Sequence, residues 1–255
     1  MERITSRTNP LMTHIRKLSS SAAYRREQGE FLCDSPKLLA EALLWKAPIL
    51  TVVMTAGHEL PPLSGDVRVV EVPEDVMASV SPMKTPQGVL FTCRLPRTQL
   101  PATLEGRCYM VLDGVQDPGN VGTIIRTAYA AGLEGIILSE QCADVFSPKT
   151  LRATMGSVFR MPIVVTGDLP GYLTGLRQEG YSVISSQLDG EPFYQRSPVG
   201  EKFCLIIGNE GNGISDEVKA TATHKVKLPM RGGAESLNAA IAAGIMMYDL
   251  MKDCE

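Results

Sequence analysis

The regular alternation of apolar runs with helical patterns between residues 107 and 255 most strongly limits the fold of this chain. The apolar runs have the pattern of buried strands, at 108–113, 135–139, 163–166, 181–186 and 202–208. Helical patterns lie among them and after them, at 120–131, 147–157 and 237–252, with a further stretch between 166 and 181. Continuous apolar strands that alternate with helices are typical of a parallel sheet covered on both faces. We therefore predict an α/β domain whose ligands bind where the strands end.

The chain ahead of this alternation has a different character. Residues 95–106, LPRTQLPATLEG, carry two prolines and no apolar periodicity, which is typical of a linker. Helical patterns and short β-like runs precede it, at 11–26, 35–46, 49–54, 67–72 and 87–93. The predicted organisation is a small α/β domain over 1–94, a linker over 95–106 and the parallel-sheet domain over 107–255.

The composition excludes several classes of protein. With 44% hydrophobic and 21% charged residues, the chain is not expected to be disordered. No apolar stretch approaches the length of a membrane span, and the N-terminus, MERITSRTNP, lacks the apolar core of a signal peptide. The six cysteines form no C-x-x-C pair, and neither an H-E-x-x-H nor a P-loop motif is present. We expect a cytoplasmic protein with no membrane segment and no metal.

Positive charge gathers at the start of the chain. The net charge is −3, but residues 1–26 hold six basic side chains against the single acid Glu2, a local charge of +5. A basic end on an acidic body is the electrostatic footprint of a nucleic-acid-binding protein. A solvated helix face explains the same pattern, and the sequence leaves both interpretations open.

A glycine-rich loop follows the last apolar run, in the stretch 205–215, LIIGNEGNGIS. Its glycines are not spaced as in the dinucleotide fingerprint, which also belongs after the first strand of such a unit. Glu210 in the middle of the loop would repel a phosphate but tolerate a cation or a sugar hydroxyl. The alternative is a tight turn from strand to helix, with no ligand.

A second loop begins where an apolar run ends at Asp113. Asn120 is placed to cap the helix that follows. Gly122 and Arg126 are four residues apart, so they share a helix face, and the arginine would lean toward the helix start. This geometry predicts a guanidinium aimed at the edge of the sheet. The alternative is a surface arginine beside an ordinary cap.

The third loop, in the stretch 227–250, meets Pro229 after a strand end and continues through glycines to Ser236, which can cap the last helix. Asn238 then falls in its first turn. Small residues at 239–244 allow another backbone to approach closely. They indicate either a tightly packed core helix or one that contacts a partner subunit.

Together the three loops resemble the signature motifs of the SpoU family, the RNA ribose 2′-O-methyltransferases of the SPOUT superfamily. The matching stretches are D-P-G-N-V-G-T-I-I-R-T-A at 117–128, I-G-N-E-G-N-G-I at 207–214 and L-P-M-x5-S-L-N-A-A-x-A at 228–242. The first part of the chain is similar to the small ribosomal-protein-like RNA-binding domain of many members, through T-S-R-T-N-P-L-M at 5–12 and G-E-F-L at 29–32. Asp34-Ser35 stands where that domain often has a Glu-Gly pair.

The resemblance implies a fold, a cofactor and a set of site residues. The fold would be a SPOUT-type parallel sheet with a trefoil knot, in a homodimer, and the cofactor would be S-adenosylmethionine. Arg126 would act on the 2′-OH, which we interpret as holding a phosphate or the developing alkoxide, because guanidinium does not readily give up its proton. The other residues implied as catalytic are Asn120, Glu210, Ser236 and Asn238. Those implied as cofactor-binding are Gly208, Leu228 and Leu237, with Ile207 and Met230 as neighbours.

The predicted substrate is structured RNA, and ribosomal RNA of the 23S type is preferred to transfer RNA. Salt-dependent RNA contacts are expected from Arg7, Lys17, Arg25 and Arg26. The alternatives are a tRNA 2′-O-methyltransferase, a non-catalytic RNA-binding factor of ribosome assembly, and an unrelated nucleotide-dependent enzyme. The intact motif residues argue against the second, and the glycine spacing with Glu210 argues against the third.

Overall fold

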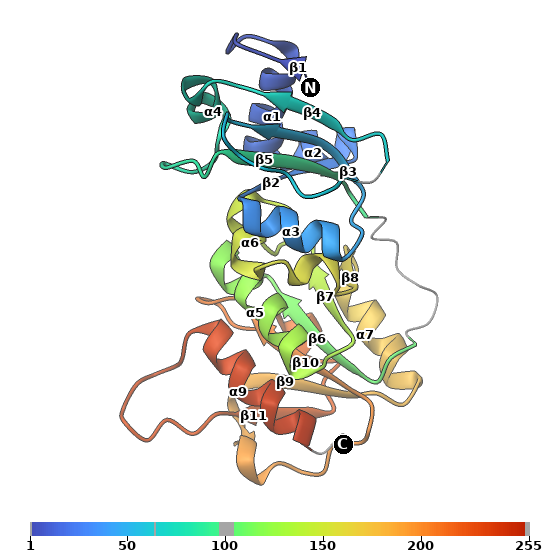
Figure 1. Ribbon diagram of the computed structural model, residues 1–255. Helices are drawn as coiled ribbons and strands as arrows, with labels where there is room; N and C mark the ends of the chain where they lie inside the picture. Colours follow the sequence, from blue (N-terminus) through green and yellow to red (C-terminus); the bar gives the residue numbers. More distant parts are fainter. Residues whose placement is uncertain (1, 64, 97–104, 253–255) are drawn as a thin grey trace. The chain divides into compact units, whose positions relative to one another are not determined.

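The computed structural model describes residues 2–63, 65–96 and 105–252 (Figure 1). The chain forms two compact units, one of Met1–Arg97 with Asp144–Arg160 and one of Thr98–Ala143 with Met161–Glu255. Most of the predicted linker, residues 97–104, lies outside the described residues. Each unit has a sheet of its own.

The second unit contains a parallel sheet of six strands in the order β11-β9-β10-β6-β7-β8. The strands are β6 (Cys108–Asp113), β7 (Gly135–Ser139), β8 (Ile163–Thr166), β9 (Ser182–Pro192), β10 (Phe203–Gly208) and β11 (His224–Lys227). The predicted parallel sheet is confirmed. Gly208 pairs with Asp113, so β10 and β6 end at the same level. The loops that follow these two strands therefore start side by side.

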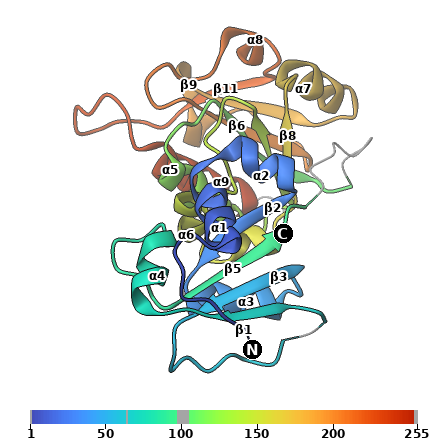
Figure 2. The ribbon, with the colours of Figure 1, turned by 90° about the horizontal axis from the view of Figure 1, so that it is seen from above.

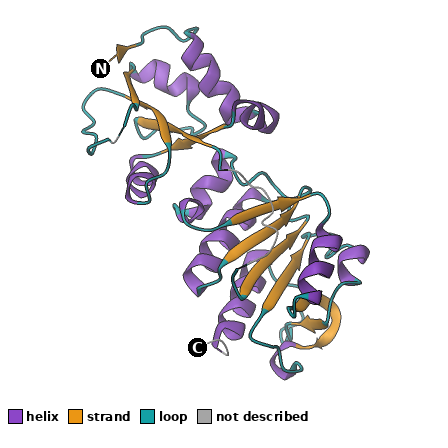
Figure 3. Cartoon of the chain, turned by 90° about the vertical axis from the view of Figure 1, so that its right-hand side faces the viewer, coloured by secondary structure: helices purple, strands orange, loops and turns teal. Residues whose placement is uncertain are grey.

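Helices cover both faces of this sheet (Figure 3). They are α5 (Pro118–Ala131), α7 (Leu169–Gln178), α8 (Asp216–Lys219) and α9 (Ala239–Met251). Buried side chains of alternate strand positions, such as Val111 and Ile137, pack with Leu173 of α7 and Val218 of α8. On the other face, α5 and α9 lie side by side (Figure 2).

The small residues of α9 pack within the chain. A Cβ atom placed on Gly244 would lie 3.6 Å from Cγ2 of Thr127 on α5. That is an ordinary van der Waals distance, so this side of α9 packs against α5. Together with the burial of Ala240 and Ala243, it favours the core-packing interpretation for this side of the helix. A different side of α9 carries Ile241, Ile245 and Tyr248, which are exposed.

The first unit holds a mixed sheet in the order β1-β4-β3-β5-β2. Its strands are β1 (Glu2–Arg3), β2 (Glu30–Asp34), β3 (Ile49–Met54), β4 (Arg68–Glu71) and β5 (Val89–Arg94). Its helices are α1 (Pro10–Ser20), α2 (Ala22–Gln28), α3 (Pro36–Leu44), α4 (Glu74–Val80) and, from the later segment, α6 (Pro148–Thr154) with the short η1 (Ser157–Phe159).

The single helix predicted over 11–26 is wrong, because Ser21 divides it into α1 and α2. Ser21 has an extended backbone, with φ −125° and ψ 114°. Its backbone N–H donates to the carbonyl of Lys17 and ends α1, while its hydroxyl accepts from the N–H of Tyr24 and starts α2. A serine inside a helical pattern can act as such a cap, and periodicity alone does not reveal it.

The segment Asp144–Arg160 belongs to the first unit, although it lies far along the sequence. Three ion pairs hold it there, Arg25–Asp144, Asp34–Arg152 and Glu41–Arg160. The rings of Phe31 and Phe146 also pack together, with centroids 5.0 Å apart. The core of this unit therefore draws on residues from both sides of the predicted linker.

One of the four predicted RNA-binding residues has a different role in the structure. Arg25 is only 4% exposed, and its guanidinium donates to Asp144 and to the carbonyl oxygens of Leu18 and Ser19. A buried and fully engaged arginine cannot reach a phosphate, so Arg25 is a structural residue. Lys17 and Arg26 are exposed, and Arg7 is exposed while paired with Asp75 at 2.8 Å.

Within the described ranges, no helix has both the length and the apolar character needed to cross a membrane. Over the same residues, no three His, Cys, Asp or Glu side chains are grouped as they would be around a metal ion. The described cysteines are free thiols, at Cys33, Cys93, Cys108, Cys142 and Cys204.

We expect Arg152→Ala to destabilise the first unit strongly. Asp34 is 2% exposed, and its Oδ1 atom has no hydrogen-bond partner among the described residues, so Arg152 is its counter-charge. Burial already raises the pKa of Asp34, and Arg152 opposes that rise. Removing one partner of a buried pair costs about 3–5 kcal/mol. Urea unfolding should report this loss of stability.

The control is Arg68→Ala, because Arg68 forms a half-exposed pair with Glu2. Such surface pairs contribute about 0–1 kcal/mol. Adding Asp34→Asn to Arg152→Ala should recover part of the loss, since it removes the uncompensated charge. Equal effects of Arg152→Ala and Arg68→Ala would contradict this account.

Candidate active site

The loop after β10 is folded by the side chain of Asn209. Its Oδ1 accepts hydrogen bonds of 2.9 Å from the backbone N–H groups of Gly211 and Asn212. Its Nδ2 donates to the carbonyl of Gly114, 2.8 Å away in the loop after β6. Backbone bonds between Asn209 and Gly213 close the turn, and Gly213 has the positive φ of 70° that this path requires. The sequence motifs predicted no role for Asn209.

Gly208 is required by sterics at the mouth of this loop. A Cβ atom at this position would lie 2.3 Å from the carbonyl carbon of Gly213 and 2.3 Å from the nitrogen of Ile214. Both are backbone atoms, so no side-chain movement could relieve the overlap. The loop therefore folds back over the end of β10 only because residue 208 is glycine.

Glu210 faces the start of α5. Its carboxylate accepts hydrogen bonds from the backbone N–H of Gln116 at 3.1 Å, from that of Asp117 at 3.2 Å and from Nδ2 of Asn120 at 2.8 Å. Partial burial by itself raises the pKa of Glu210, but these hydrogen bonds together lower it. The carboxylate therefore stays ionised at neutral pH and joins the two loops.

A further hydrogen bond extends this network to the third motif. Asn238 donates from Nδ2 to Oδ1 of Asn120 over 2.9 Å. The Oδ1 atom of Asn238 accepts from the backbone N–H groups of Ala240 and Ile241 at the start of α9. Glu210, Asn120 and Asn238, one from each predicted motif, thus form one continuous hydrogen-bonded chain.

Two predicted helix caps are wrong. Asp117 rather than Asn120 caps α5, because its Oδ1 accepts from the N–H of Asn120. Asn238 rather than Ser236 caps α9. In both loops a second polar residue lies two or three positions from the expected cap. The sequence pattern does not show which of the two residues caps the helix.

Arg126 and Ser236 are brought to the surface but not into this network. Arg126 is exposed on α5, and no described residue forms a hydrogen bond or ion pair with it. Ser236 is exposed in the wide loop between β11 and α9 (Figure 1) and likewise makes no hydrogen bond to any described residue. Both groups are therefore available to a ligand.

The residues predicted to bind the cofactor come from three strand and helix ends. Ile207 and Gly208 end β10, Leu228 follows β11, and Leu237 precedes α9. Ile207 and Leu228 are buried, Met230 is half-buried and Leu237 is 40% exposed. These positions offer apolar side chains and backbone groups but no cluster of cations. That is compatible with a sulfonium nucleoside and unsuited to a triphosphate.

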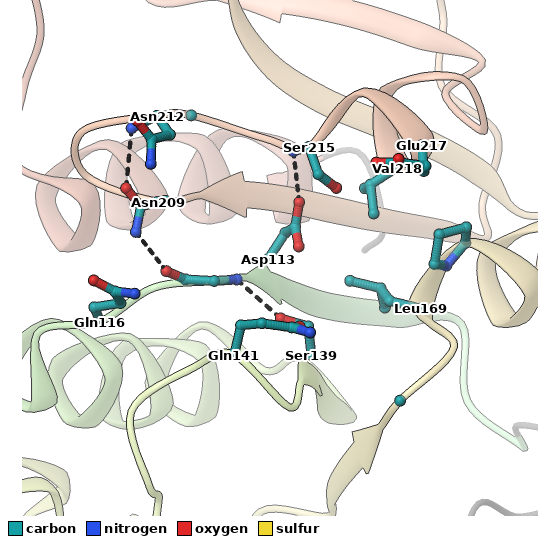
Figure 4. Close-up of a pocket in the computed structure, with 14 residues that line it drawn as sticks. Asp113, Gln116, Ser139, Gln141, Leu169, Asn209, Asn212, Ser215, Glu217 and Val218 are labelled. Atoms are coloured by element: carbon teal, nitrogen blue, oxygen red, sulfur yellow. Dashed lines mark hydrogen bonds between the residues drawn. The ribbon is translucent and has the colours of Figure 1, made fainter.

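A cavity of about 490 Å³ lies beside the glycine-rich loop, at the ends of β6, β7 and β8 (Figure 4). Asp113 lies at its base and accepts a 2.7 Å hydrogen bond from the N–H of Ser215. The Oγ of Ser139 accepts from the N–H of Gly114 at 2.9 Å. None of the residues predicted to bind the cofactor lines this cavity.

Comparison with known proteins identifies the family. The model of the SpoU rRNA methylase family matches residues 107–248. This chain belongs to that family. The model of an MRM3-like substrate-binding domain matches residues 9–90, within the predicted N-terminal domain. Sequence resemblance through three short motifs is thereby confirmed over most of the chain.

Two relatives are similar to this chain in sequence over almost its full length. The chain is 36% identical to the 23S rRNA (guanosine(2553)-2′-O)-methyltransferase RlmP of Bacillus subtilis, over 98% of this chain and 99% of that protein. It is 34% identical to an uncharacterised tRNA/rRNA methyltransferase of Synechocystis, over 96% of this chain and 92% of that protein.

Solved structures of rRNA methyltransferases have the same fold. An AdoMet-bound rRNA methyltransferase from Sinorhizobium meliloti matches with a TM-score of 0.87 and 34% identity, over 99% of this chain and 98% of that one. The SpoU methyltransferase AviRb from Streptomyces viridochromogenes, in complex with AdoMet, matches with a TM-score of 0.85 and 26% identity, over 96% and 98%. The predicted fold class and the predicted RNA methyltransferase class are confirmed, and S-adenosylmethionine agrees with these complexes.

The steric role of Gly208 leads to a test at the predicted cofactor site. We expect Gly208→Ala to weaken binding of S-adenosylhomocysteine at least tenfold in titration calorimetry, because the added methyl group forces the loop off the end of β10. Gly211→Ala is the matched control, since its Cβ would meet only Oδ1 of Asn209, at 3.6 Å. Normal binding by Gly208→Ala would show that the closed loop is not needed for the cofactor.

Proposed function

We propose that this chain transfers the methyl group of S-adenosylmethionine to a ribose 2′-OH of 23S-type ribosomal RNA. The observation that carries the proposal is the hydrogen-bonded chain from Glu210 through Asn120 to Asn238, which joins the three motif loops near a free Arg126. The close relative in Bacillus subtilis, named for 2′-O-methylation of a 23S rRNA guanosine, supports the substrate. A cytoplasmic location follows from this role.

The roles of the polar residues follow from which of their atoms already form hydrogen bonds within the protein. Both ends of the Asn120 carboxamide are bonded, to Glu210 and to Asn238, so Asn120 positions the loops rather than the ribose. Glu210 accepts three hydrogen bonds and its pKa is lowered, so it is a poor base for the 2′-OH proton. These residues act by fixing geometry.

Arg126 is then the residue that acts on the substrate. S-adenosylmethionine, when bound, supplies a methyl group already activated by its positive sulfur. The protein must place the 2′-oxygen in line with that group and stabilise the charge that develops on this oxygen as its proton passes to water and S-adenosylhomocysteine is left. A guanidinium keeps its own proton, so Arg126 serves as a hydrogen-bond donor to the alkoxide or to an adjacent phosphate. The hydroxyl of Ser236 is a second free donor.

The test of the function is transfer of a radiolabelled methyl group from S-adenosylmethionine to RNA from cells that lack this gene. Ribosomal and transfer RNA are assayed separately. Label in 23S rRNA, mapped to a 2′-O-methyl group, is the expected result. Label in tRNA alone would move the proposal to the tRNA alternative. No label and no cofactor binding would favour the non-catalytic assembly factor.

Arg126→Ala should reduce methyl transfer by about 10²–10³-fold, the loss typical when a donor to a developing oxyanion is removed. Its affinity for S-adenosylhomocysteine should stay within about twofold of wild type, because Arg126 bonds to none of the described loop residues. Single-turnover assays and calorimetry separate these effects. Loss of cofactor affinity would assign Arg126 to the cofactor instead.

Arg7, Lys17 and Arg26 are proposed to contact RNA phosphates from the first unit. Replacing Lys17 or Arg26 by glutamine should lower the slope of log affinity against log salt by about one per contact. Arg25→Gln gives a contrasting result, since it should change stability and leave the slope unaltered. Filter binding at several salt concentrations measures the slopes, and equal slopes in all variants would refute the assignment.

A homodimer is proposed through the exposed side of α9. Ile241, Ile245 and Tyr248 are spaced at helical intervals on α9 and are 37–55% exposed, so they form an apolar stripe, and the exposed Leu237 lies just before the helix. Ile241→Asp should shift the chain from dimer to monomer in light scattering after size exclusion. Leu44→Asp, at an exposed apolar residue of α3, is the control. A monomeric wild type would refute this surface as a dimer interface.

A further inference from the structure

The cavity at the ends of β6, β7 and β8 is lined neither by the residues predicted to bind the cofactor nor by Glu210, Asn120 and Asn238. The side chains of Gln116, Gln141, Asn212, Ser215 and Glu217 border it and form no hydrogen bond or ion pair with any described residue. Figure 4 shows how they surround the space beside Asp113 and Ser139. The cavity is therefore edged by polar groups that are free to bind a ligand.

The charges of the lining exclude one class of ligand. Asp113 and Glu217 carry carboxylates, whereas the lining contains no lysine, arginine or histidine. A phosphate or another anion would meet repulsion and find no cation. A neutral group that presents N–H donors would find acceptors in the carboxylates and in the side-chain amides.

The remaining lining favours a planar ring. Leu169, Pro170 and Val218 supply an apolar wall beside the polar edge. The side-chain carboxamides of the lining each offer a hydrogen-bond donor beside an acceptor, and the edges of nucleic-acid bases offer the same combination. Unpaired RNA bases bind to proteins through these edges and through apolar contacts with their faces. A volume of about 490 Å³ is ample for one base with its sugar.

The cavity is also built from the loops that carry the proposed catalysis. The backbone N–H of Gln116 donates to Glu210, while the Gln116 side chain borders the cavity. Asn209, the neighbour of Glu210, donates to the carbonyl of Gly114, and both residues line the cavity. A ligand held here would be held by the same two loops that meet the target ribose.

We propose that this cavity receives an unpaired base of the RNA substrate, close in the strand to the methylated nucleotide. The inference rests on the proposed function. Because acceptors outnumber donors in the lining, bases with an amino group are preferred to uracil. The cavity thus selects the sequence around the target, while the phosphates of the strand stay outside.

The first test places the photoreactive residue p-benzoylphenylalanine at position 141 of the full-length chain and irradiates it with unmodified 23S rRNA transcript. A crosslink to an unpaired base near the methylated ribose is expected. The same residue at position 174, exposed on α7 and outside the cavity, is the control. The same crosslinks from both positions, or none from position 141 while methyl transfer proceeds, would overturn the proposal.

The second test measures steady-state kinetics of Glu217→Ala and Gln141→Ala. We expect the KM for the transcript to rise about tenfold, with kcat and the affinity for S-adenosylhomocysteine unchanged. Asp216→Ala is the matched control, since Asp216 lies beside Glu217 on α8, pairs with Lys219 and does not line the cavity. An unchanged KM in both cavity variants would overturn the proposal.

The two proposals fail in different ways. If the wild-type chain methylates 23S rRNA and the cavity variants behave as wild type, only the cavity assignment is lost. If the wild-type chain methylates no RNA, the proposed function fails, and the cavity proposal fails with it.

Discussion

The carboxylate of Glu210 is the interaction on which the candidate site depends. It accepts from two backbone N–H groups of the loop after β6 and from the side chain of Asn120, so it holds two loops that are about 90 residues apart in sequence. A neutral acceptor would bind the same donors more weakly. A glycine loop that carries a carboxylate is therefore suited to bonding the neighbouring loop, and its ligand need not be cationic.

Backbone sterics make that interaction possible. Asp113 and Gly208 end paired strands at one level, and the path after Gly208 turns back so tightly that a Cβ there would overlap the backbone of Gly213 and Ile214. The side chain of Asn209 then fixes the turn from within and attaches it to Gly114. The register of β6 and β10 and the absence of a side chain at Gly208 thus bring Glu210 to the start of α5.

Local sequence was sufficient for β6, β7, β8 and β10, because a buried parallel strand is apolar throughout and has clear ends. It predicted only the end of β11, of which only Val226 is buried, and it ended β9 at residue 186 although the strand continues to Pro192. The motif resemblance supplied the family and Glu210, Asn120 and Asn238, which the structure joins. It could not show that Asp117 and Asn238 are the caps, because competing polar residues lie within three positions. Nor could it show that Arg25 is buried, since its partner Asp144 is distant in sequence. Asn209 was missed for a related reason, because its role is visible only in the folded turn.

The position of Asn238 links the proposed dimer to the active site. The Oδ1 atom of Asn238 accepts hydrogen bonds from the first N–H groups of α9, and its Nδ2 group donates to Asn120. Asn120 in turn donates to Glu210. The exposed Leu237 lies next to Asn238 just before α9, and the apolar stripe of the helix starts one turn later at Ile241. A partner that covers the stripe would fix the first turn of α9, and with it the donor that Asn120 requires. Burial of apolar surface at such an interface would then stabilise the geometry of the three motif loops, so an isolated subunit would hold these loops less firmly than the proposed dimer would.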